Sequence, residues 1–547
     1  MSTKEWWRSS VIYQIYPRSF ADANGDGIGD LAGITSRLPK LKELGIDAIW
    51  LSPFMTSPQK DAGYDVANYC DVDPLFGTLA DFDKLESTAH NLGLKVIVDL
   101  VPNHCSSEHP WFIEALAAGE GSEERARFMF REGKGPNGEL PPNNWESVFG
   151  GPAWTQTTNP DGTPGQWYLH LFDSSQPDFD WTNRWVRDRF IEILRFWLDR
   201  GVDGFRVDVA HGLSKAPGLP DFRRDEKYWN TPAEVRPDNP YFGHDGVHEI
   251  YREWHQLLEE YPGERILCAE AFVEPLTKMA LWVRPDEMQQ AFNFPFLVTR
   301  WNGEQMRQVI KDSISAFHAV GAPSTWVLSN HDQIRHATRL ALDPNAKTAD
   351  RITGIGPLTE PKPDNSLGLA RGRAASTMML ALPGVAYMYQ GEELGLPEAM
   401  DIPDDKRQDP TFFRTAGESY GRDGCRVPIP WEADATNYGF GPAGEPWLPQ
   451  PAVYRDFARD LQEGAAGSTL ELYKAALAIR KDRALGDGDL QWIEGTPENV
   501  LGFRNNGVTV FINYSEEDFA LPDGEIILDS ADSSSGVLTP ASAVWMV

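Results

Sequence analysis

Cysteine is scarce in this chain. Its 547 residues include four cysteines, and no two of them form a Cys-x-x-Cys pair. Four thiols in so long a chain cannot make the dense disulfide framework of a small secreted domain, and their spacing gives no sign of a zinc site. A hydrophobic content of 41% is ample for a large buried core, so we expect the fold to depend on that core.

Long apolar runs and a surplus of basic charge are also absent. No stretch is apolar over enough residues to span a bilayer, and the first ten residues show no signal-peptide pattern. Acidic residues number 81 against 50 basic ones, for a formal net charge of −31, which argues against nucleic acid or an anionic membrane as a partner. We expect a cytoplasmic protein that acts on a neutral small molecule. Whether it forms a homodimer stays open.

Strand-like and helix-like segments alternate from the start to about residue 395. The apolar runs typical of buried strands are 11–16, 48–51, 95–101, 204–210, 266–272, 326–328 and 385–389. Helical patterns lie between them, and such alternation predicts parallel βαβ units. About eight units favour a closed barrel over an open sheet. The sixth strand is poorly marked, and we place it near 292–296.

The alternation stops at two places, and these set the predicted domain boundaries. Residues 104–181 are rich in Gly, Pro, Asn and Trp and show little periodicity, so we interpret them as an inserted subdomain after the third strand. Short alternating runs after the last helix predict a small β-sandwich over 483–547. Residues 1–103 and 182–482 would form the barrel. The predicted fold class is therefore α/β, a (β/α)8 TIM barrel with these two additions.

Four of the predicted strands end in polar or charged residues that a buried strand does not need. These residues are Asp99, Asn103 and His104 on the third strand, Arg206 and Asp208 on the fourth, Glu270 on the fifth, and Asn330, His331 and Asp332 on the seventh. A charge in an apolar strand costs several kcal/mol unless it is paired. One such case could be a structural ion pair. Four cases near the C-terminal ends of strands indicate an active site, because active sites of parallel barrels form there.

Two of these carboxyl groups have surroundings that suit different roles. Arg206 and Asp208 are two residues apart on a strand and share one face. A guanidinium group beside a carboxylate lowers its pKa, which would keep Asp208 ionised as a nucleophile. Glu270 has apolar sequence neighbours, and partial desolvation would raise its pKa, as a proton donor requires. Two carboxyl groups with different pKa values are what glycoside hydrolysis needs.

Four ordered motifs resemble the conserved regions of the α-amylase family of glycoside hydrolases, family 13. They are Asp-Leu-Val-Pro-Asn-His at 99–104, Gly-Phe-Arg-Val-Asp at 204–208, Ala-Glu-Ala at 269–271 and Ser-Asn-His-Asp at 329–332. The segments that resemble signatures of its oligo-1,6-glucosidase and α-glucosidase subgroup are 62–65, 176–180 and 391–395. The resemblance covers nearly the whole chain.

This resemblance implies a retaining, exo-acting α-glucosidase with three catalytic carboxyl groups. Asp208 would be the nucleophile, Glu270 the proton donor and later the base, and Asp332 the residue that holds the 2- and 3-hydroxyls. The other residues implied to bind the same glucose are Arg206, His104 and His331 around the ring, Tyr64 beneath it, and Asp61 with Arg422 as the pair that closes the pocket beyond it. The product would be α-glucose from the non-reducing end of maltose and other short α-glucosides.

The segment 22–30 places candidate metal ligands at alternate positions. They are Asp22, Asn24, Asp26, Ile28 and Asp30. With a Gly at the sixth position, this spacing resembles the start of a calcium loop, although Gly33 stands where an EF-hand has Glu. The resemblance to the α-glucosidase and oligo-1,6-glucosidase subgroup implies that this loop binds one structural Ca²⁺, or Mg²⁺ in its place. The alternative is an Asn/Asp/Gly turn without an ion.

Three alternatives remain after this comparison. A glucosyl-enzyme ester can be attacked by a sugar hydroxyl as well as by water, so a transglucosidase, a trehalose synthase or a sucrose isomerase competes with a hydrolase. The residue after the proposed nucleophile is Val209. In the subgroup that this chain resembles, Val at this position often accompanies α-1,6 cleavage, as in oligo-1,6-glucosidases that cleave isomaltose. Ala210 and His211 depart from that pattern. We therefore favour α-1,4 links. A non-catalytic, transport-associated relative is disfavoured because all three carboxylates are present.

Overall fold

The chain folds into two compact units, and each of them contains parallel strands. The computed structural model describes residues 5–159, 161–222, 239–343 and 354–547. Unit 1 comprises Met1–Ser52, Leu75–Val96 and Phe292–Val547, and unit 2 comprises Pro53–Pro74 and Ile97–Ala291. Each unit contains four strands of the parallel α/β fold. This arrangement confirms the predicted parallel α/β barrel.

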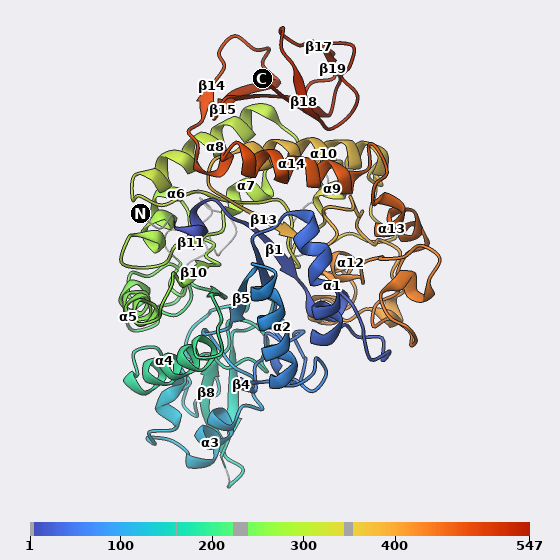
Figure 1. Ribbon diagram of the computed structural model, residues 1–547. Helices are drawn as coiled ribbons and strands as arrows, with labels where there is room; N and C mark the ends of the chain where they lie inside the picture. Colours follow the sequence, from blue (N-terminus) through green and yellow to red (C-terminus); the bar gives the residue numbers. More distant parts are fainter. Residues whose placement is uncertain (1–4, 160, 223–238, 344–353) are drawn as a thin grey trace. The chain divides into compact units, whose positions relative to one another are not determined.

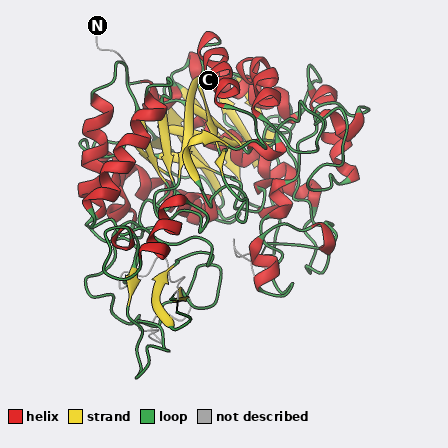
Figure 2. Cartoon of the chain, turned by 90° about the horizontal axis from the view of Figure 1, so that it is seen from below, coloured by secondary structure: helices red, strands yellow, loops and turns green. Residues whose placement is uncertain are grey.

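Unit 1 contains four of these strands, in the order β2-β1-β13-β12. They are β1 (Val11–Ile15), β2 (Ala48–Leu51), β12 (Thr325–Val327) and β13 (Val385–Tyr389), all parallel and buried. Helices, red in Figure 2, flank the yellow strands. The helices of unit 1 are α1 (Leu31–Leu44), α2 (Leu79–Asn91), α7 (Phe294–Val298), α8 (Gly303–His318), α9 (His336–Arg339), α10 (Asn365–Ala381), α11 (Pro410–Arg414), α12 (Asp423–Arg426), α13 (Arg459–Gln462) and α14 (Thr469–Asp482).

Unit 2 contains the other four strands, in the order β11-β10-β9-β5. They are β5 (Lys95–Leu100), β9 (Gly204–Val207), β10 (Ile266–Ala269) and β11 (Gln290–Ala291), again parallel. The remaining elements here include a short antiparallel pair, β3 (Met55–Thr56) with β4 (Asn68–Val72), and the helices α3 (Pro110–Ala118), α4 (Arg184–Leu198), α5 (Val247–Glu259) and α6 (Leu276–Met279).

The sixth barrel strand lies before its predicted position. Strand β11 ends at Ala291, and the next residue, Phe292, forms a parallel bridge with Thr325 of β12. The side chain of Asn293 then caps helix α7. The prediction of a strand over 292–296 is therefore wrong for most of that range, because a short apolar run does not distinguish a strand from a buried helix.

The predicted subdomain segment 104–181 is mostly irregular. It contains one three-stranded antiparallel sheet in the order β6-β8-β7, built from β6 (Phe130–Arg131), β7 (Trp154–Thr158) and β8 (Pro164–Leu169). Trp145 and Trp154 belong to a hydrophobic cluster of unit 2 that also includes Val209, the second residue after β9. The core of this segment therefore packs against a residue at the end of a barrel strand. The predicted domain boundaries stay predictions.

The C-terminal part forms the predicted antiparallel sheets. The larger sheet has the order β14-β15-β16-β20-β18, from β14 (Gln491–Trp492), β15 (Val500–Asn505), β16 (Val508–Asn513), β18 (Ile526–Asp529) and β20 (Ser542–Met546). A second sheet pairs β17 (Phe519–Ala520) with β19 (Val537–Leu538). The C-terminal strands are coloured red in Figure 1, next to α10 and α14. Strand β20 packs on α10, where Trp545 Nε1 donates to the carbonyl of Thr377 at 3.0 Å.

Two sequence-based expectations concern features of the whole described chain. All four cysteines are free thiols, as expected for a chain without a disulfide framework. In the part of the chain that the structure describes, no helix has both the length and the apolar character needed to cross a bilayer.

Candidate active site

Asp208 and Glu270 lie at the C-terminal ends of two neighbouring parallel strands of unit 2. Asp208 directly follows β9, and Glu270 directly follows β10. The N–H of Asp208 donates to the carbonyl of Leu100 at 2.9 Å, and the N–H of Glu270 donates to the carbonyl of Val207 at 2.9 Å. The backbone ladder of the sheet therefore holds both residues, as expected for functional groups at this end of barrel strands.

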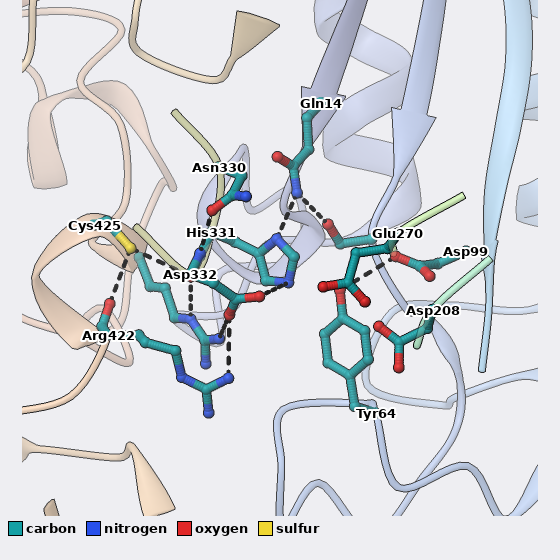
Figure 3. Close-up of polar contacts among 12 residues, drawn as sticks. Gln14, Tyr64, Asp99, Asp208, Glu270, Asn330, His331, Asp332, Arg422 and Cys425 are labelled. Atoms are coloured by element: carbon teal, nitrogen blue, oxygen red, sulfur yellow. Dashed lines mark hydrogen bonds and ion pairs between the residues drawn. The ribbon is translucent and has the colours of Figure 1, made fainter. Parts of the chain in front are cut away.

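Arg206 gathers three carboxyl groups around one guanidinium group. Its Nη1 lies 2.9 Å from Asp99 Oδ1 and 2.6 Å from Asp208 Oδ1. Its Nη2 lies 3.6 Å from Glu270 Oε2. Tyr64 adjoins this cluster, because its hydroxyl donates to Asp99 Oδ2 at 3.2 Å (Figure 3). Asp99 was recognised as a polar residue in its predicted strand but was not predicted to be a site residue.

Burial dominates the pKa of Asp208. Its side chain is 9% exposed, and burial raises the pKa of its carboxyl well above the usual range, with Arg206 opposing the rise and Glu270 and Asp99 adding to it. Burial also raises the pKa of Asp99. The prediction that Arg206 keeps the pKa of Asp208 low is therefore wrong in its outcome. One cation does not offset desolvation together with two neighbouring carboxyl groups.

Glu270 is more exposed than Asp208. Its side chain is 18% exposed, against 9% for Asp208. The side chain of Glu270 is therefore partly desolvated, and that of Asp208 is the more deeply buried of the two.

Val209, the residue after Asp208, turns the backbone toward Glu270. Its φ is 45°, in the left-handed region, which costs a β-branched residue about 1–3 kcal/mol. In this conformation its N–H donates to Glu270 Oε2 at 2.8 Å. A backbone donor at Oε2 requires this oxygen to accept. Oε1 is therefore the oxygen of Glu270 that can carry an acidic proton.

The predicted sugar-binding residues His104, Tyr64 and Asp61 lie together in unit 2. His104 Nε2 is 3.2 Å from the carbonyl oxygen of Tyr64. Asp61 Oδ2 accepts from Gln176 Nε2 at 3.1 Å, and the same Gln176 nitrogen lies 3.2 Å from His104 Nε2. Burial lowers the pKa of His104 to about 4, so its ring is neutral at pH 7. Gln176 was not predicted as a site residue, although it is the first residue of the 176–180 segment that resembles a subgroup signature.

A second carboxyl cluster, in unit 1, centres on Asp332. Its Oδ1 accepts from Arg422 Nη1 at 3.1 Å and from Arg426 Nη2 at 2.8 Å. Its Oδ2 lies 3.4 Å from His331 Nε2 (Figure 3). Asp409 Oδ2 accepts from Arg422 Nε at 2.6 Å. The structure therefore brings three predicted residues together and adds Arg426 and Asp409, which were not predicted.

His331 is held from its other side by the first barrel strand. Gln14 Nε2 of β1 lies 2.7 Å from His331 Nδ1, and Tyr16 stacks on the imidazole with a centroid distance of 5.7 Å. Gln14 is a polar residue in the middle of an apolar, buried strand. The same signal that identified Asp208 and Glu270 would have identified it.

Arg422 connects two carboxylates of unit 1. Against the effect of burial, Arg422 and Arg426 hold the pKa of Asp409 at about 2, so Asp409 is ionised at neutral pH and keeps Arg422 in place. Asp61 belongs to unit 2 and Arg422 to unit 1. Their pairing stays a prediction.

The predicted cation loop is a tight turn whose side-chain oxygens accept from its own backbone. Both oxygens of Asp22 accept from glycine N–H groups of the loop, Asn24 Oδ1 accepts from Asp26, and Asp26 Oδ1 accepts from Ile28. Asp30 also caps helix α1. In the described ranges, no group of three or more His, Cys, Asp and Glu side chains is arranged to hold a metal ion. The loop fits Ca²⁺ by donor type, because its donors are hard oxygens that retain further lone pairs.

The whole chain is similar to known carbohydrate-active enzymes. Residues 14–488 match the family described as "Alpha amylase, catalytic domain". A probable alpha-glucosidase of Rhizobium meliloti (strain 1021) is 38% identical over 94% of this chain and 90% of that protein. An oligo-1,6-glucosidase of Parageobacillus thermoglucosidasius is 34% identical over 95% of this chain and 92% of that protein. The crystal structure of an alpha-glucosyl transfer enzyme, XgtA, matches with a TM-score of 0.83 and 35% identity over 100% of this chain and 99% of that chain.

Proposed function

The chain belongs to the α-amylase family and is a glycoside hydrolase, and we propose that it is a retaining, exo-acting α-glucosidase. It would release α-glucose from the non-reducing end of maltose and short α-glucosides. The observation that carries this proposal is the pair Asp208 and Glu270, which end neighbouring strands and both contact the guanidinium group of Arg206. Two carboxyl groups beside one reacting centre are what glycoside hydrolysis requires.

In the first step, a carboxylate oxygen of Asp208 attacks C1 of the terminal glucose while the bond from C1 to the leaving oxygen breaks. Glu270 gives its proton to that leaving oxygen. Because Val209 donates to Oε2, the proton comes from Oε1. The product of this step is a β-glucosyl ester on Asp208 and a shortened sugar.

In the second step, Glu270 takes a proton from a water molecule, whose oxygen attacks C1 and breaks the ester bond. Asp208 leaves as a carboxylate, and the product is α-glucose. Each step inverts C1, so two steps retain its configuration. Three carboxyl groups around one guanidinium group favour retention of one proton, and the first step requires this proton on Glu270 when Asp208 attacks as a carboxylate.

Asp332 is proposed as the third catalytic carboxyl group. It would accept hydrogen bonds from the 2- and 3-hydroxyls of the glucose, and such bonds strengthen as the ring distorts toward the transition state. Arg422 and Arg426 fix its orientation by two bonds to Oδ1. His331, Tyr64 and the remaining predicted residues would contact the same sugar.

Two alternative activities have specific support. The relative named oligo-1,6-glucosidase favours α-1,6 cleavage, and the similarity to XgtA favours transfer of glucose to a sugar acceptor. Trehalose synthesis and sucrose isomerisation are variants of that transfer. The cytoplasmic location and a homodimer stay predictions.

The test is glucose release from maltose, isomaltose, sucrose and trehalose in parallel, with the anomer of the fresh product read by NMR. We expect α-glucose, with maltose cleaved faster than isomaltose. Faster cleavage of isomaltose would reassign the linkage. β-Glucose as the first product would exclude the retaining mechanism. New disaccharides with little free glucose would identify a transferase or isomerase.

Arg422→Ala should weaken the selection for a terminal glucose. The substitution removes the ion pairs of Arg422 with Asp332 and Asp409, and the loss of such charge-assisted bonds corresponds to a decrease of about 10- to 100-fold in kcat/KM for maltose. The variant should also begin to cleave maltodextrins whose non-reducing end is chemically blocked. Arg455→Ala, which removes a solvent-exposed pair with Asp434, is the matched control. Unchanged kcat/KM and selectivity would remove Arg422 from the pocket.

We also propose that the loop with Asp22, Asn24, Asp26, Ile28 and Asp30 binds one structural Ca²⁺, or Mg²⁺. An ion bound only by the folded state stabilises it in proportion to the logarithm of its concentration. Removal by EDTA should therefore lower Tm by about 2–4 °C, and added Ca²⁺ should restore it. Asp26→Ala, at an exposed side chain, should abolish this response, whereas Asp188→Ala should keep it. A Tm that does not respond to EDTA or Ca²⁺ would favour an ion-free turn.

A further inference from the structure

Lys215 is a buried lysine in the segment after β9. Its side chain is 3% exposed, and Nζ lies 2.8 Å from Oδ2 of the buried Asp178. Nζ also donates to the carbonyl of Gly212 at 2.6 Å and to Oδ1 of Asn103 at 3.0 Å. An ammonium group has three donors, and these three acceptors use all of them. A buried charge held this completely is costly to disturb.

Lys215 decides which way the amide group of Asn103 faces. Because an ammonium group cannot accept a hydrogen bond, the amide oxygen must be the atom that faces Nζ. The amide nitrogen then lies 3.1 Å from Asp178 Oδ2 and 3.2 Å from His104 Nδ1. A turn of the amide by 180° would place N–H groups against Lys215 and an oxygen against the Asp178 carboxylate, and both contacts are repulsive.

The amide nitrogen of Asn103 in turn decides the tautomer of His104. Nδ1 faces an N–H donor, so it must be the ring nitrogen with a lone pair. The proton of the neutral imidazole is then on Nε2, which lies 3.2 Å from the carbonyl oxygen of Tyr64. Gln176 Nε2 is equally close to this ring nitrogen, but it donates to Asp61 Oδ2.

The charge state of His104 agrees with this arrangement. Burial lowers the pKa of His104 to about 4, and the positive charge of Lys215 adds to that effect, while Asp178 opposes it. An imidazolium would also direct an Nδ1–H at the amide N–H of Asn103. The ring is therefore neutral at pH 7, and a single tautomer satisfies its neighbours.

We propose that Lys215 is a positioning residue that acts through Asn103 to hold His104 as its neutral Nε2–H tautomer, and that this N–H, which faces the Tyr64 carbonyl at 3.2 Å, is shared with a hydroxyl oxygen of the bound sugar. The last step rests on the proposed function. The tautomer itself is a property of the free protein, so the tautomer and the role of His104 in sugar binding can be refuted separately.

The tautomer can be read by NMR on protein labelled with ¹⁵N-histidine, because protonated and unprotonated ring nitrogens differ strongly in chemical shift. The signals of His104 are identified by their absence in His104→Gln. In the wild type at pH 7, we expect an unprotonated Nδ1 and a protonated Nε2. A proton on Nδ1 would overturn the proposal.

Asn103→Asp replaces the hydrogen-bond donor beside His104 Nδ1 by an acceptor at almost constant side-chain volume. A carboxylate oxygen would replace the amide N–H beside Nδ1, so the proton of His104 should move from Nε2 to Nδ1. Lys215→Met should release the amide of Asn103 and give a mixture of tautomers. Lys134→Met is the matched control, because it removes a solvent-exposed lysine of the same unit that pairs with Asp221 at 3.4 Å. The wild-type tautomer in Asn103→Asp, with the introduced carboxyl group shown by its ¹³C chemical shift to be ionised beside Asp178, would overturn the proposal even if Lys215→Met does not fold.

Kinetics test the link to the sugar. In Asn103→Asp, kcat/KM for maltose should fall about tenfold, mainly through KM, because His104 would present a lone pair where the hydroxyl oxygen needs a donor. Lys134→Met should keep the wild-type value. A moved proton with unchanged kcat/KM would overturn the role of His104 as a sugar donor. No α-glucosidase activity in the wild type would refute the proposed function and leave the NMR result standing.

Discussion

Replacement of Asp208 by Ala should reduce kcat for maltose by about 10⁴-fold or more, because no other group would form the bond to C1. The fold should persist, since Arg206 keeps its ion pair with Asp99. Circular dichroism and Tm would check this. Asp188→Ala removes a solvent-exposed carboxylate that pairs with Arg184 and should leave kcat unchanged.

Azide can identify the missing group in Asp208→Ala. The anion would occupy the space of the lost carboxylate and attack C1 of an activated α-glucoside from the same face. One inversion gives β-glucosyl azide, which NMR distinguishes from its anomer. Near-normal activity without azide, or α-glucosyl azide as the product, would show that Asp208 is not the nucleophile.

Glu270→Ala should reduce kcat for maltose by about 10²–10⁴-fold, the range that general acid–base catalysis contributes. The loss in the first step should be much smaller for α-glucosyl fluoride, because fluoride leaves without a proton. A burst of fluoride followed by slow turnover would then report accumulation of the ester on Asp208, since no base activates water for the second step.

Azide should give the opposite anomer in this variant. Attack on the ester inverts C1 a second time, so the product is α-glucosyl azide. Opposite anomers from Asp208→Ala and Glu270→Ala would assign the two roles independently of any pKa. Equal losses for maltose and α-glucosyl fluoride, without a burst, would contradict the role of Glu270 as proton donor.

Local patterns in the sequence predicted most barrel elements. Strands β2 and β13 coincide with the predicted ranges, and helix α1 ends where Gly45 takes a φ of 103°, because only glycine adopts this conformation at little cost. The prediction of the sixth strand was wrong, because its apolar run continues into helix α7. Short apolar segments owe their conformation to their neighbours in space.

The candidate site was predictable in part. Charged residues at strand ends identified Asp208 and Glu270, and the structure places them on neighbouring strands. Their relative burial could not be predicted, because it depends on which chain segments cover each carboxyl group.

The sequence by itself determined which chemical groups this protein carries and at which strand ends they stand, because apolar period and motif order are local properties. Only the tertiary structure decided the partners of those groups. Asn103 meets Lys215 across 112 positions of the chain, and Asp332 meets Arg426 across 94. Such partners fix pKa values, proton positions and side-chain orientation. They are set by the folded path of the backbone, since electrostatic and hydrogen-bond energies depend on distance in space.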